Sequence, residues 1–458
     1  MQKKYTPLSV HPDNPHYFLF REKPEILITS CEHYGAVLNL GVDHDIYLDE
    51  LKNCGMNATR LFTGYYHEIP GAFGIEGNTL APEVGMYLCP WERTDVPGAR
   101  GGGNKFDLDR FDEKYMKRLY SFLQKASERN IVVELSLFCP FYEHVENGIQ
   151  WEIAPLFYDN NINDVEKVSI TEVHNLRYPR LLFYQEKMVK KIVTLLNCFD
   201  NLYYEICNEP YNDGITKEWQ RHIAKLIVEA EKELDNKHLI GQNIANGFEL
   251  IEDPDENVSV FSFHYTGSVC MIANYGLGKP VGCNETGFNG SAPDFYRQQA
   301  WELFMSGAGT YFGLDYSFTS TVSDGSFEGK NQPGTGSREF RLQLKALKEF
   351  LYNAGFINMK PNYSFIKQCD YANGNFYAMA ELGKTYAVYG NCNMSSLVLN
   401  IPYGIYNVTW LNPVSCAQSQ SKINHNTGKY LVLTQPDELY KNSKDNHIGE
   451  FAVSISLL

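Results

Sequence analysis

Long apolar segments, paired cysteines and an excess of basic charge are all missing from this sequence. No run of residues approaches the roughly 18 apolar positions that a membrane-spanning helix needs. The eleven cysteines form no Cys-x-x-Cys pair and have no histidine at metal-ligand spacing, which argues against a zinc site or a disulfide framework. Residues Met1 to Pro7 are basic but lead into no apolar core, unlike a secretion signal. We expect a reduced, cytoplasmic protein, or a periplasmic or secreted one if a signal peptide has been removed.

The charge balance narrows the range of partners. Forty basic and 55 acidic residues give a net charge of −15, which repels nucleic acids and anionic membrane surfaces. Aromatic residues make up 14% of the chain, with 31 Tyr and 27 Phe, and such rings stack on sugars and bases alike. Because the charge argues against nucleic acids, neutral polyols such as carbohydrates are the expected ligands. Nothing in the sequence indicates the oligomeric state.

Strand-like and helix-like segments alternate along most of the chain. The periodicity predicts an α/β fold, a (β/α)8 barrel within residues 1–358, because such alternation is typical of parallel βαβ units. Two long segments, 64–109 and 140–175, lack periodicity and are expected to be functional loops. Eight strands are predicted at 25–30, 56–62, 131–138, 201–207, 238–243, 258–265, 279–285 and 309–316. Helices are predicted at 46–55, 112–129, 178–196, 218–234, 293–306 and 337–352.

The last hundred residues have a different character. From about residue 359 to 458, short alternating segments are separated by proline and glycine turns, and no helical pattern occurs. This predicts a small all-β domain, a β-sandwich. The segment contains no cluster of titratable residues that resembles a site, so we expect it to support stability more than chemistry.

Two glutamates stand where predicted strands end. The fourth strand stops at Asn208-Glu209-Pro210, where proline cannot continue the ladder, and the seventh stops at Asn284-Glu285. In a parallel barrel the carboxyl ends of the strands carry the chemistry. Two carboxylates that flank a bond suffice for glycoside hydrolysis, one as proton donor and one as nucleophile or base. No cation lies beside Glu209 in sequence, which favours the donor role for it, and Arg60 on the second strand would keep Glu285 ionised.

These residues resemble the clan A retaining glycoside hydrolases, which include the cellulases and mannanases of family 5. The resemblance covers about residues 20 to 355, with Gly55 to Arg60 on the second strand as a further match. It implies that Glu209 is the acid/base and Glu285 the nucleophile. It also implies that Asn208 binds the sugar 2-hydroxyl, that Arg60 pairs with the nucleophile, and that His264 is the sixth-strand histidine. The C-terminal segment is similar to the sandwich of several bacterial members.

Three features depart from that pattern. The clan often has His-x-Tyr on strand six, with the tyrosine touching the nucleophile, whereas this chain has His264-Tyr265-Thr266. The order therefore predicts that Tyr265 binds substrate without that role. The tryptophan usual on strand eight is missing, and Asp315-Tyr316 stands there, so Tyr316 is a candidate replacement platform. The loop after strand three lacks the family 5 histidine.

The remaining candidates are aromatic or titratable residues near the predicted site. Trp91 and Trp151, on the two long loops, are predicted to stack on sugar rings. Trp219, Trp301 and Trp410 fall at helix or strand spacing and are predicted to be core. His33, at the end of the first strand, either contacts the ligand or packs in the interior. Glu32 and Glu134 are interpreted as structural.

The sequence thus predicts a retaining β-glycosidase that acts on a β-linked oligo- or polysaccharide and needs no metal or organic cofactor. One alternative is a barrel that binds glycans without cleaving them, against which the pair of carboxylates argues. Another is transglycosylation at the same site. The sugar, the linkage and the choice between endo and exo action stay open at this level.

Overall fold

Eight parallel strands form the central sheet of the computed structural model, which describes residues 5–212, 214–440 and 449–458. Their order in the sheet is β4-β13-β12-β11-β10-β9-β8-β5. The two end strands meet through Asn57, whose backbone N donates to Ile28 O over 3.3 Å, so the sheet closes into a barrel. The strands are β4 (Leu27–Cys31), β5 (Ala58–Phe62), β8 (Val132–Phe138), β9 (Leu202–Cys207), β10 (Ile240–Asn246), β11 (Val260–His264), β12 (Val281–Glu285) and β13 (Thr310–Leu314). All eight predicted strands are confirmed.

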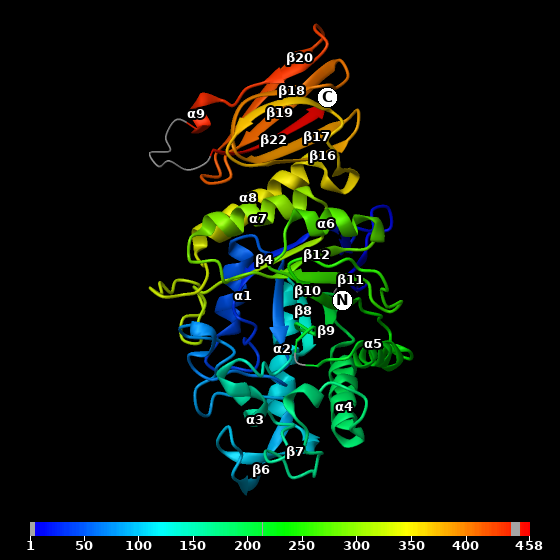
Figure 1. Ribbon diagram of the computed structural model, residues 1–458, viewed down its shortest axis with the longest axis vertical. Helices are drawn as coiled ribbons and strands as arrows, with labels where there is room; N and C mark the ends of the chain where they lie inside the picture. The colour runs from blue at the N-terminus through cyan, green and yellow to red at the C-terminus, as the bar shows by residue number, and fades with distance from the viewer. Residues whose placement is uncertain (1–4, 213, 441–448) are drawn as a thin grey trace.

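Helices surround this barrel (Figure 1). A typical example is α2, which begins after Asp112, whose side chain accepts hydrogen bonds from the backbone N of Lys114 and Tyr115 at 2.7 and 2.9 Å. The helices are α1 (His44–Asn53), α2 (Glu113–Glu128), α4 (Pro179–Leu196), α5 (Lys217–Glu231), α6 (Ser268–Asn274), α7 (Pro293–Met305) and α8 (Arg338–Ala354). Residues 247–259, all of which the structure describes, connect β10 to β11 without a helix, so one of the eight predicted strand–helix units is incomplete. Within the described residues, no helix combines the length and the apolar character needed to cross a bilayer.

The two long loops contain regular elements that the sequence did not reveal. The first carries η1 (Ala72–Gly74) and the hairpin of β6 (Trp91–Pro97) and β7 (Asn104–Phe111). The second carries η2 (Glu146–Gly148), α3 (Ile149–Ile153) and η3 (Ile170–Glu172). An isolated bridge between Phe106 and Asn161 joins the two loops, so they form one structured cap. Two further short turns of 3-10 helix are η4 (Tyr275–Leu277) and η5 (Phe356–Asn358).

A small sheet covers the amino-terminal end of the barrel. It consists of β1 (Ser9–Val10), β2 (Phe18–Phe20) and β3 (Lys23–Glu25). Its apolar side chains, including Phe18 at 0% exposure, share a buried cluster with barrel-strand residues, most of them at or next to the first residue of their strand. Those barrel residues are Leu27, Ala58, Val132, Tyr203, Val260 and Phe312. The carboxyl ends of the strands, where the predicted glutamates lie, are at the opposite end.

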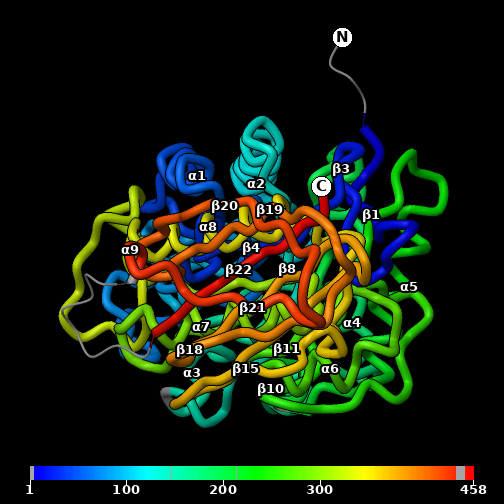
Figure 2. Tube along the Cα trace, turned by 90° about the horizontal axis from the view of Figure 1, so that it is seen from above, coloured from blue at the N-terminus to red at the C-terminus, as the bar shows by residue number. Residues whose placement is uncertain are grey.

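The C-terminal segment is a β-sandwich, as predicted. One sheet has the order β14-β16-β17-β22-β19-β20 and the other β15-β18-β21. Apolar side chains of both sheets, among them Val388, Leu397 and Val453, form a buried core between them. The strands are β14 (Lys360–Pro361), β15 (Ile366–Ala372), β16 (Phe376–Glu381), β17 (Thr385–Asn391), β18 (Asn393–Leu399), β19 (Gly404–Leu411), β20 (Gln418–His425), β21 (Leu431–Leu433) and β22 (Glu450–Leu457), with a short helix α9 (Asp437–Tyr440). Figure 2 shows these strands lying over α7 and α8.

Helices α7 and α8 join the sandwich to the barrel. The ring of Trp301 on α7 stacks on Tyr389 of β17 with centroids 4.8 Å apart, and both belong to the main barrel core. Beside them Arg297 Nη2 lies 2.5 Å from Glu450 Oε1, and both side chains are 2% exposed. A buried ion pair inside an apolar contact of this kind fixes the relative orientation of the two parts.

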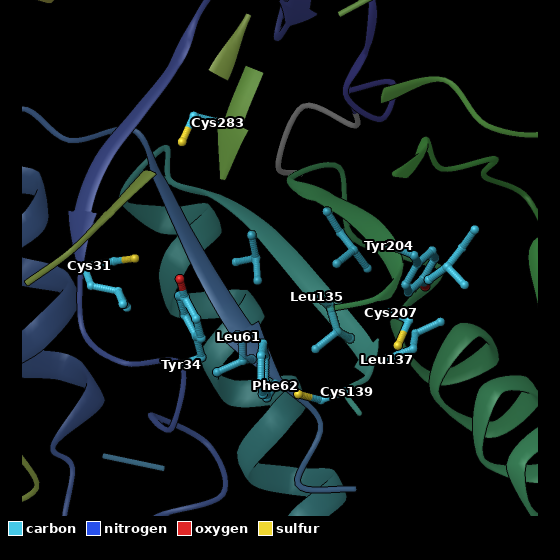
Figure 3. Packing of buried hydrophobic residues seen from close by; sticks show 14 of the residues in the cluster. Cys31, Tyr34, Leu61, Phe62, Leu135, Leu137, Cys139, Tyr204, Cys207 and Cys283 are labelled. Atoms are coloured by element: carbon cyan, nitrogen blue, oxygen red, sulfur yellow. The ribbon is translucent and has the colours of Figure 1, made fainter. Parts of the chain in front are cut away.

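All eleven cysteines lie within the described residues and none is in a disulfide. Eight of them are buried. Figure 3 shows Cys31, Cys139, Cys207 and Cys283 among the packed side chains of the barrel core. Buried free cysteine packs as a small hydrophobic residue, in agreement with the prediction of reduced thiols.

The interface predicts a measurable cost for breaking its ion pair. Glu450→Gln should lower thermal stability, by on the order of 2 kcal/mol, because the buried Arg297 would lose one carboxylate partner and keep Asp294, whose side chain is 41% exposed. Thermal unfolding followed by circular dichroism measures the change. The matched control is Glu381→Gln, which removes a solvent-exposed pair with Lys384 and should shift stability by less than about 0.5 kcal/mol. Equal effects of the two variants would contradict this assignment.

Candidate active site

Arg60 on β5 lies at the centre of the barrel and is 0% exposed. Its Nη1 donates to Glu285 Oε2 over 3.1 Å, and its Nη2 donates to Glu205 Oε2 over 2.5 Å. Its Nε lies 2.7 Å from Glu134 Oε1, and Glu134 is its direct neighbour in the β5–β8 register. One guanidinium therefore holds three carboxylates from three strands.

Amide and hydroxyl donors compensate the surplus negative charge below Arg60. Asn284 Nδ2 donates to Glu134 Oε1 over 2.7 Å and to Glu205 Oε1 over 2.6 Å. Tyr203 OH donates to the other oxygen of Glu134. Burial and the charge of Glu205 nevertheless raise the pKa of Glu134. These residues support the site from below, which agrees with the interpretation of Glu134 as structural.

Glu285, the last residue of β12, is held by four donors. Tyr265 OH donates to its Oε1 over 2.6 Å and Tyr34 OH to its Oε2 over 3.0 Å, in addition to Arg60. His264 Nδ1 lies 3.3 Å from its Oε1. Burial opposes ionisation, but the charges of His264 and Arg60 outweigh it and lower the pKa of Glu285. Glu285 is therefore an ionised carboxylate at neutral pH.

The position of Tyr265 corrects the expectation that it does not touch the seventh-strand glutamate. Tyr265 has φ +49°, the left-handed conformation that non-glycine residues rarely adopt. The register between β11 and β12 also shifts between Phe263 and His264. Together these irregularities turn the Tyr265 hydroxyl back onto Glu285, although Tyr265 follows His264 directly in sequence.

Glu209 follows β9 and faces the same space. Its φ is +38°, so the chain turns sharply where the strand ends. Tyr211 OH donates to its Oε1 and Asn212 Nδ2 to its Oε2, each over 3.2 Å. Carboxylate oxygens of Glu209 and Glu285 approach to within 4.8 Å of each other. The predicted pair of carboxylates is thus brought together.

His264 links the two glutamates. Its Nδ1 lies 3.0 Å from Glu209 Oε1 and 3.3 Å from Glu285 Oε1. Burial works against the imidazolium, but the charge of Glu285 and the hydrogen bond to Glu209 raise the pKa of His264 to about 9.

Asn208 Oδ1 accepts from Arg60 Nη2 over 2.8 Å, and its Nδ2 donates to Tyr142 OH over 2.7 Å.

Several of these side chains line a pocket of about 390 Å³, a volume that includes open solvent. Aromatic rings make up much of its wall, which suits the flat apolar faces of a sugar, and the carboxylates and amides supply hydrogen bonds. Residues after β4, β5, β8, β9, β11 and β12 contribute to it. They are His33, Tyr34, Phe62, Tyr66, Glu68, Phe73, Leu80, Cys139, Tyr142, Asn208, Glu209, Tyr265, Glu285 and Phe288. His33, for which two roles were open, thus belongs to the pocket.

Three aromatic candidates do not line this pocket. Trp91 and Trp151 are 1% and 4% exposed and pack inside the cap, next to Tyr65 and Phe141 respectively, so the prediction that they stack on sugars is wrong. Tyr316 is 4% exposed and lies behind Phe288, with ring centroids 6.0 Å apart. Phe288, which is 39% exposed and lines the pocket, has the exposed aromatic ring that was expected of Tyr316. Trp219, Trp301 and Trp410 are buried, as predicted.

Several residues of the site were not predicted from the sequence. Tyr34 and Phe288 each stand three residues beyond a strand end, a position that the carboxyl-edge argument could have included. Glu205 is a charged residue inside an otherwise apolar strand, which signals a buried partner. Glu68 and Tyr142 lie in long loops without periodicity, where sequence carries no signal for their direction.

Glu209, His264 and Glu285 are also the side chains whose donor atoms could together hold a metal ion. The electrostatics disfavour a cation there. His264 would have to lose its proton, and Arg60 already lies against Glu285. The arrangement is better suited to two carboxyl groups with different roles, because Arg60 holds Glu285 and does not hold Glu209.

Several solved structures share the architecture of this protein. No family model matches the sequence, and no curated protein matches it. Among solved structures, a glycoside hydrolase family 5 protein from Bacteroides vulgatus ATCC 8482 is 13% identical with a TM-score of 0.62, covering 99% of this chain and 95% of its own. A further crystal structure from the same strain has a TM-score of 0.64 at 13% identity, with 100% and 83% covered. A structure described as a glycoside hydrolase has a TM-score of 0.61 at 12% identity, with 99% and 98% covered.

At this level of identity the similarity shows a common fold. Because these structures cover almost the whole chain, the likeness includes the sandwich as well as the barrel. The protein therefore has the (β/α)8 barrel with C-terminal β-sandwich that is found in structural neighbours from glycoside hydrolase family 5.

Proposed function

We propose that the protein is a retaining β-glycoside hydrolase that acts on a β-linked carbohydrate. The observation that carries this proposal is the pair of carboxylates at the carboxyl ends of β9 and β12. Their oxygens approach within 4.8 Å, near the separation of about 5–5.5 Å that retaining enzymes use, and below the 6.5–9.5 Å range of inverting enzymes. The aromatic pocket around them and the glycoside hydrolase neighbours of the same fold support a sugar substrate.

The surroundings of the two carboxylates favour different roles. Glu285 is held ionised by Arg60, His264 and two tyrosine hydroxyls, as a nucleophile that attacks the anomeric carbon must be. Among the described residues, Glu209 forms hydrogen bonds with the amide of Asn212, the hydroxyl of Tyr211 and the shared His264. It protonates the leaving oxygen in the first step and deprotonates water in the second.

Asn208 and Tyr34 position the reacting groups. Asn208 faces the pocket beside Arg60, where it binds the hydroxyl next to the anomeric carbon. Tyr34 OH and Arg60 both donate to Oε2 of Glu285. The other carboxylate oxygen, Oε1, accepts from Tyr265 OH. Fixed donors of this kind lower the reorganisation needed as charge moves onto the sugar ring.

The two glutamates are expected to fail in different ways when removed. Glu285→Ala should lower kcat by at least about 10⁴-fold on every substrate, because no other group can form the glycosyl intermediate. Glu209→Ala should lose roughly 10²–10⁴-fold on substrates with poor leaving groups, and much less on activated aryl glycosides. Azide should restore its turnover, since that anion needs no general base. The measurement is a screen of aryl β-glycosides and β-linked polysaccharides at mildly acidic pH.

The matched control is Glu218→Ala, an exposed glutamate at the start of α5, which should leave kcat unchanged. Proton NMR of the first-formed product decides the stereochemistry. Retention of the anomer agrees with the proposal, whereas inversion would assign a water nucleophile and remove the role of Glu285. Binding of glycans with no turnover by the wild-type protein would contradict the enzymatic proposal.

His264 is expected to remain charged through neutral pH. Its imidazole resonance in NMR, identified by its disappearance in His264→Gln, should titrate near pH 9. The internal reference is His174, which is equally buried and has no carboxylate contact within residues 5–212 and 214–440. Burial lowers its pKa to about 3, so its resonance should not move between pH 5 and 9. Titration of His264 near 6.5 would show that the two glutamates do not hold its proton.

A further inference from the structure

The pocket has one closed end and one open end. At the closed end Tyr66 and Leu80 are each 1% exposed and Glu68 is 3% exposed. At the other end Phe288 is 39% exposed, and the pocket continues into a wider hollow of about 790 Å³ that includes open solvent. The two spaces share Phe73, Glu209, Tyr265 and Phe288, and the hollow adds Asn246 and Asn289. The mouth therefore lies on the Glu209 side.

The closed end is a fixed wall made by the loop after β5. Glu68 N donates to Leu80 O over 2.8 Å, which pins two distant points of the loop together. Asn39 Nδ2 donates to Thr79 O over 2.9 Å and ties the wall to the loop after β4. The rings of His67 and Tyr87 stack with centroids 4.0 Å apart. A sugar chain could extend beyond this wall only if several packed contacts were broken.

Glu68 presents a carboxylate to the pocket from within that wall. Its Oε1 accepts from Tyr66 OH over 3.0 Å and its Oε2 from Asn78 Nδ2 over 2.5 Å. It forms no ion pair with Lys or Arg in the part of the chain that the structure describes, and burial raises its pKa. Each carboxylate oxygen can accept a second hydrogen bond. His33 Nδ1, also in the pocket wall, is buried without a hydrogen-bond partner among the described residues.

A buried carboxylate supported by two neutral donors is suited to bind hydroxyl groups. A sugar ring that fills the pocket would present its hydroxyls remote from the scissile bond to Glu68 and His33. The orientation follows from the proposed roles: the ring attacked by Glu285 lies inside the pocket, and the leaving group next to Glu209 lies at the mouth. The ring inside is then the one at the non-reducing end.

We propose that the protein removes single sugars from the non-reducing end of its substrate, with Glu68 as the residue that recognises the hydroxyls of this terminal sugar. This inference rests on the proposed glycosidase function and specifies its substrate class, a β-linked chain with a free non-reducing end. The leaving portion can vary in length because it faces the open hollow.

Product analysis separates this inference from the function on which it rests. The screen of aryl β-glycosides first identifies the sugar that is turned over best. The test substrate is then a β-linked tetrasaccharide of that sugar with a fluorescent label at its reducing end. We expect the labelled trisaccharide and one free monosaccharide as first products, then successively shorter labelled chains. Methylation of the terminal sugar's remote hydroxyl should abolish cleavage. Labelled mono- or disaccharide as a first product would overturn the inference and leave the glycosidase proposal standing, whereas no turnover of any glycoside would overturn the glycosidase proposal itself.

A substrate–variant cycle tests Glu68. Glu68→Gln should lower kcat/KM about 10–100-fold, as expected for loss of a charge-assisted hydrogen bond. For the wild type, removing the remote hydroxyl from the substrate should lower kcat/KM by a similar factor. For Glu68→Gln, the deoxy substrate and the parent sugar should have the same kcat/KM. Glu83→Gln, an exposed carboxylate on the same loop, should behave as wild type. If Glu68→Gln still discriminates fully against the deoxy sugar, or if the wild type does not discriminate, Glu68 does not recognise that hydroxyl.

Discussion

The guanidinium of Arg60 is the interaction on which the site depends. It is fully buried and touches three carboxylates, those of Glu134, Glu205 and Glu285. Burying these charges is costly unless geometry and hydrogen bonds are nearly complete. The barrel meets this condition because its strands bring the carboxylates around one point, while Asn284 donates to the two lower ones. The closed sheet and the charge cluster therefore stabilise each other.

The same cluster makes the two upper carboxylates unlike. Glu285 shares Arg60 with the lower pair and receives two tyrosine hydroxyls, so its negative charge is stabilised from every side. Glu209 follows β9, which β10 and β11 separate from β12 in the sheet, and none of its hydrogen bonds among the described residues comes from the guanidinium. His264 lies between them, with its Nδ1 3.0 Å from Glu209 Oε1 and 3.3 Å from Glu285 Oε1. Unlike environments for neighbouring carboxyl groups are what acid–base chemistry on a glycosidic bond requires.

The sequence was sufficient to predict the barrel and to name Glu209, Glu285 and Arg60, because each depends on local signals, whereas His264 was named from the family resemblance. An apolar run ends at a polar residue, and parallel strands carry their ends to one edge. Signals of this kind say little about side-chain direction in irregular backbone. Tyr265 reaches Glu285 only through a left-handed φ, which no pattern in the sequence shows. The prediction for Trp91 and Trp151 was wrong because their loops fold into a cap whose large rings are buried as part of the main barrel core.

The loops shape the space around the carboxylate pair that the strands position. The strands can place a carboxylate pair with equal ease at the bottom of an open groove or of a blind pocket. Here the segment between β5 and α2 is tied to the loop after β4 and closes one side with Tyr66, Glu68 and Leu80. Phe73 from the same segment meets Phe288 from the loop after β12 at the mouth, with centroids 6.3 Å apart. Since the wall is packed and the mouth is exposed, these loops leave the pocket open on one side, as the proposed removal of terminal sugars requires.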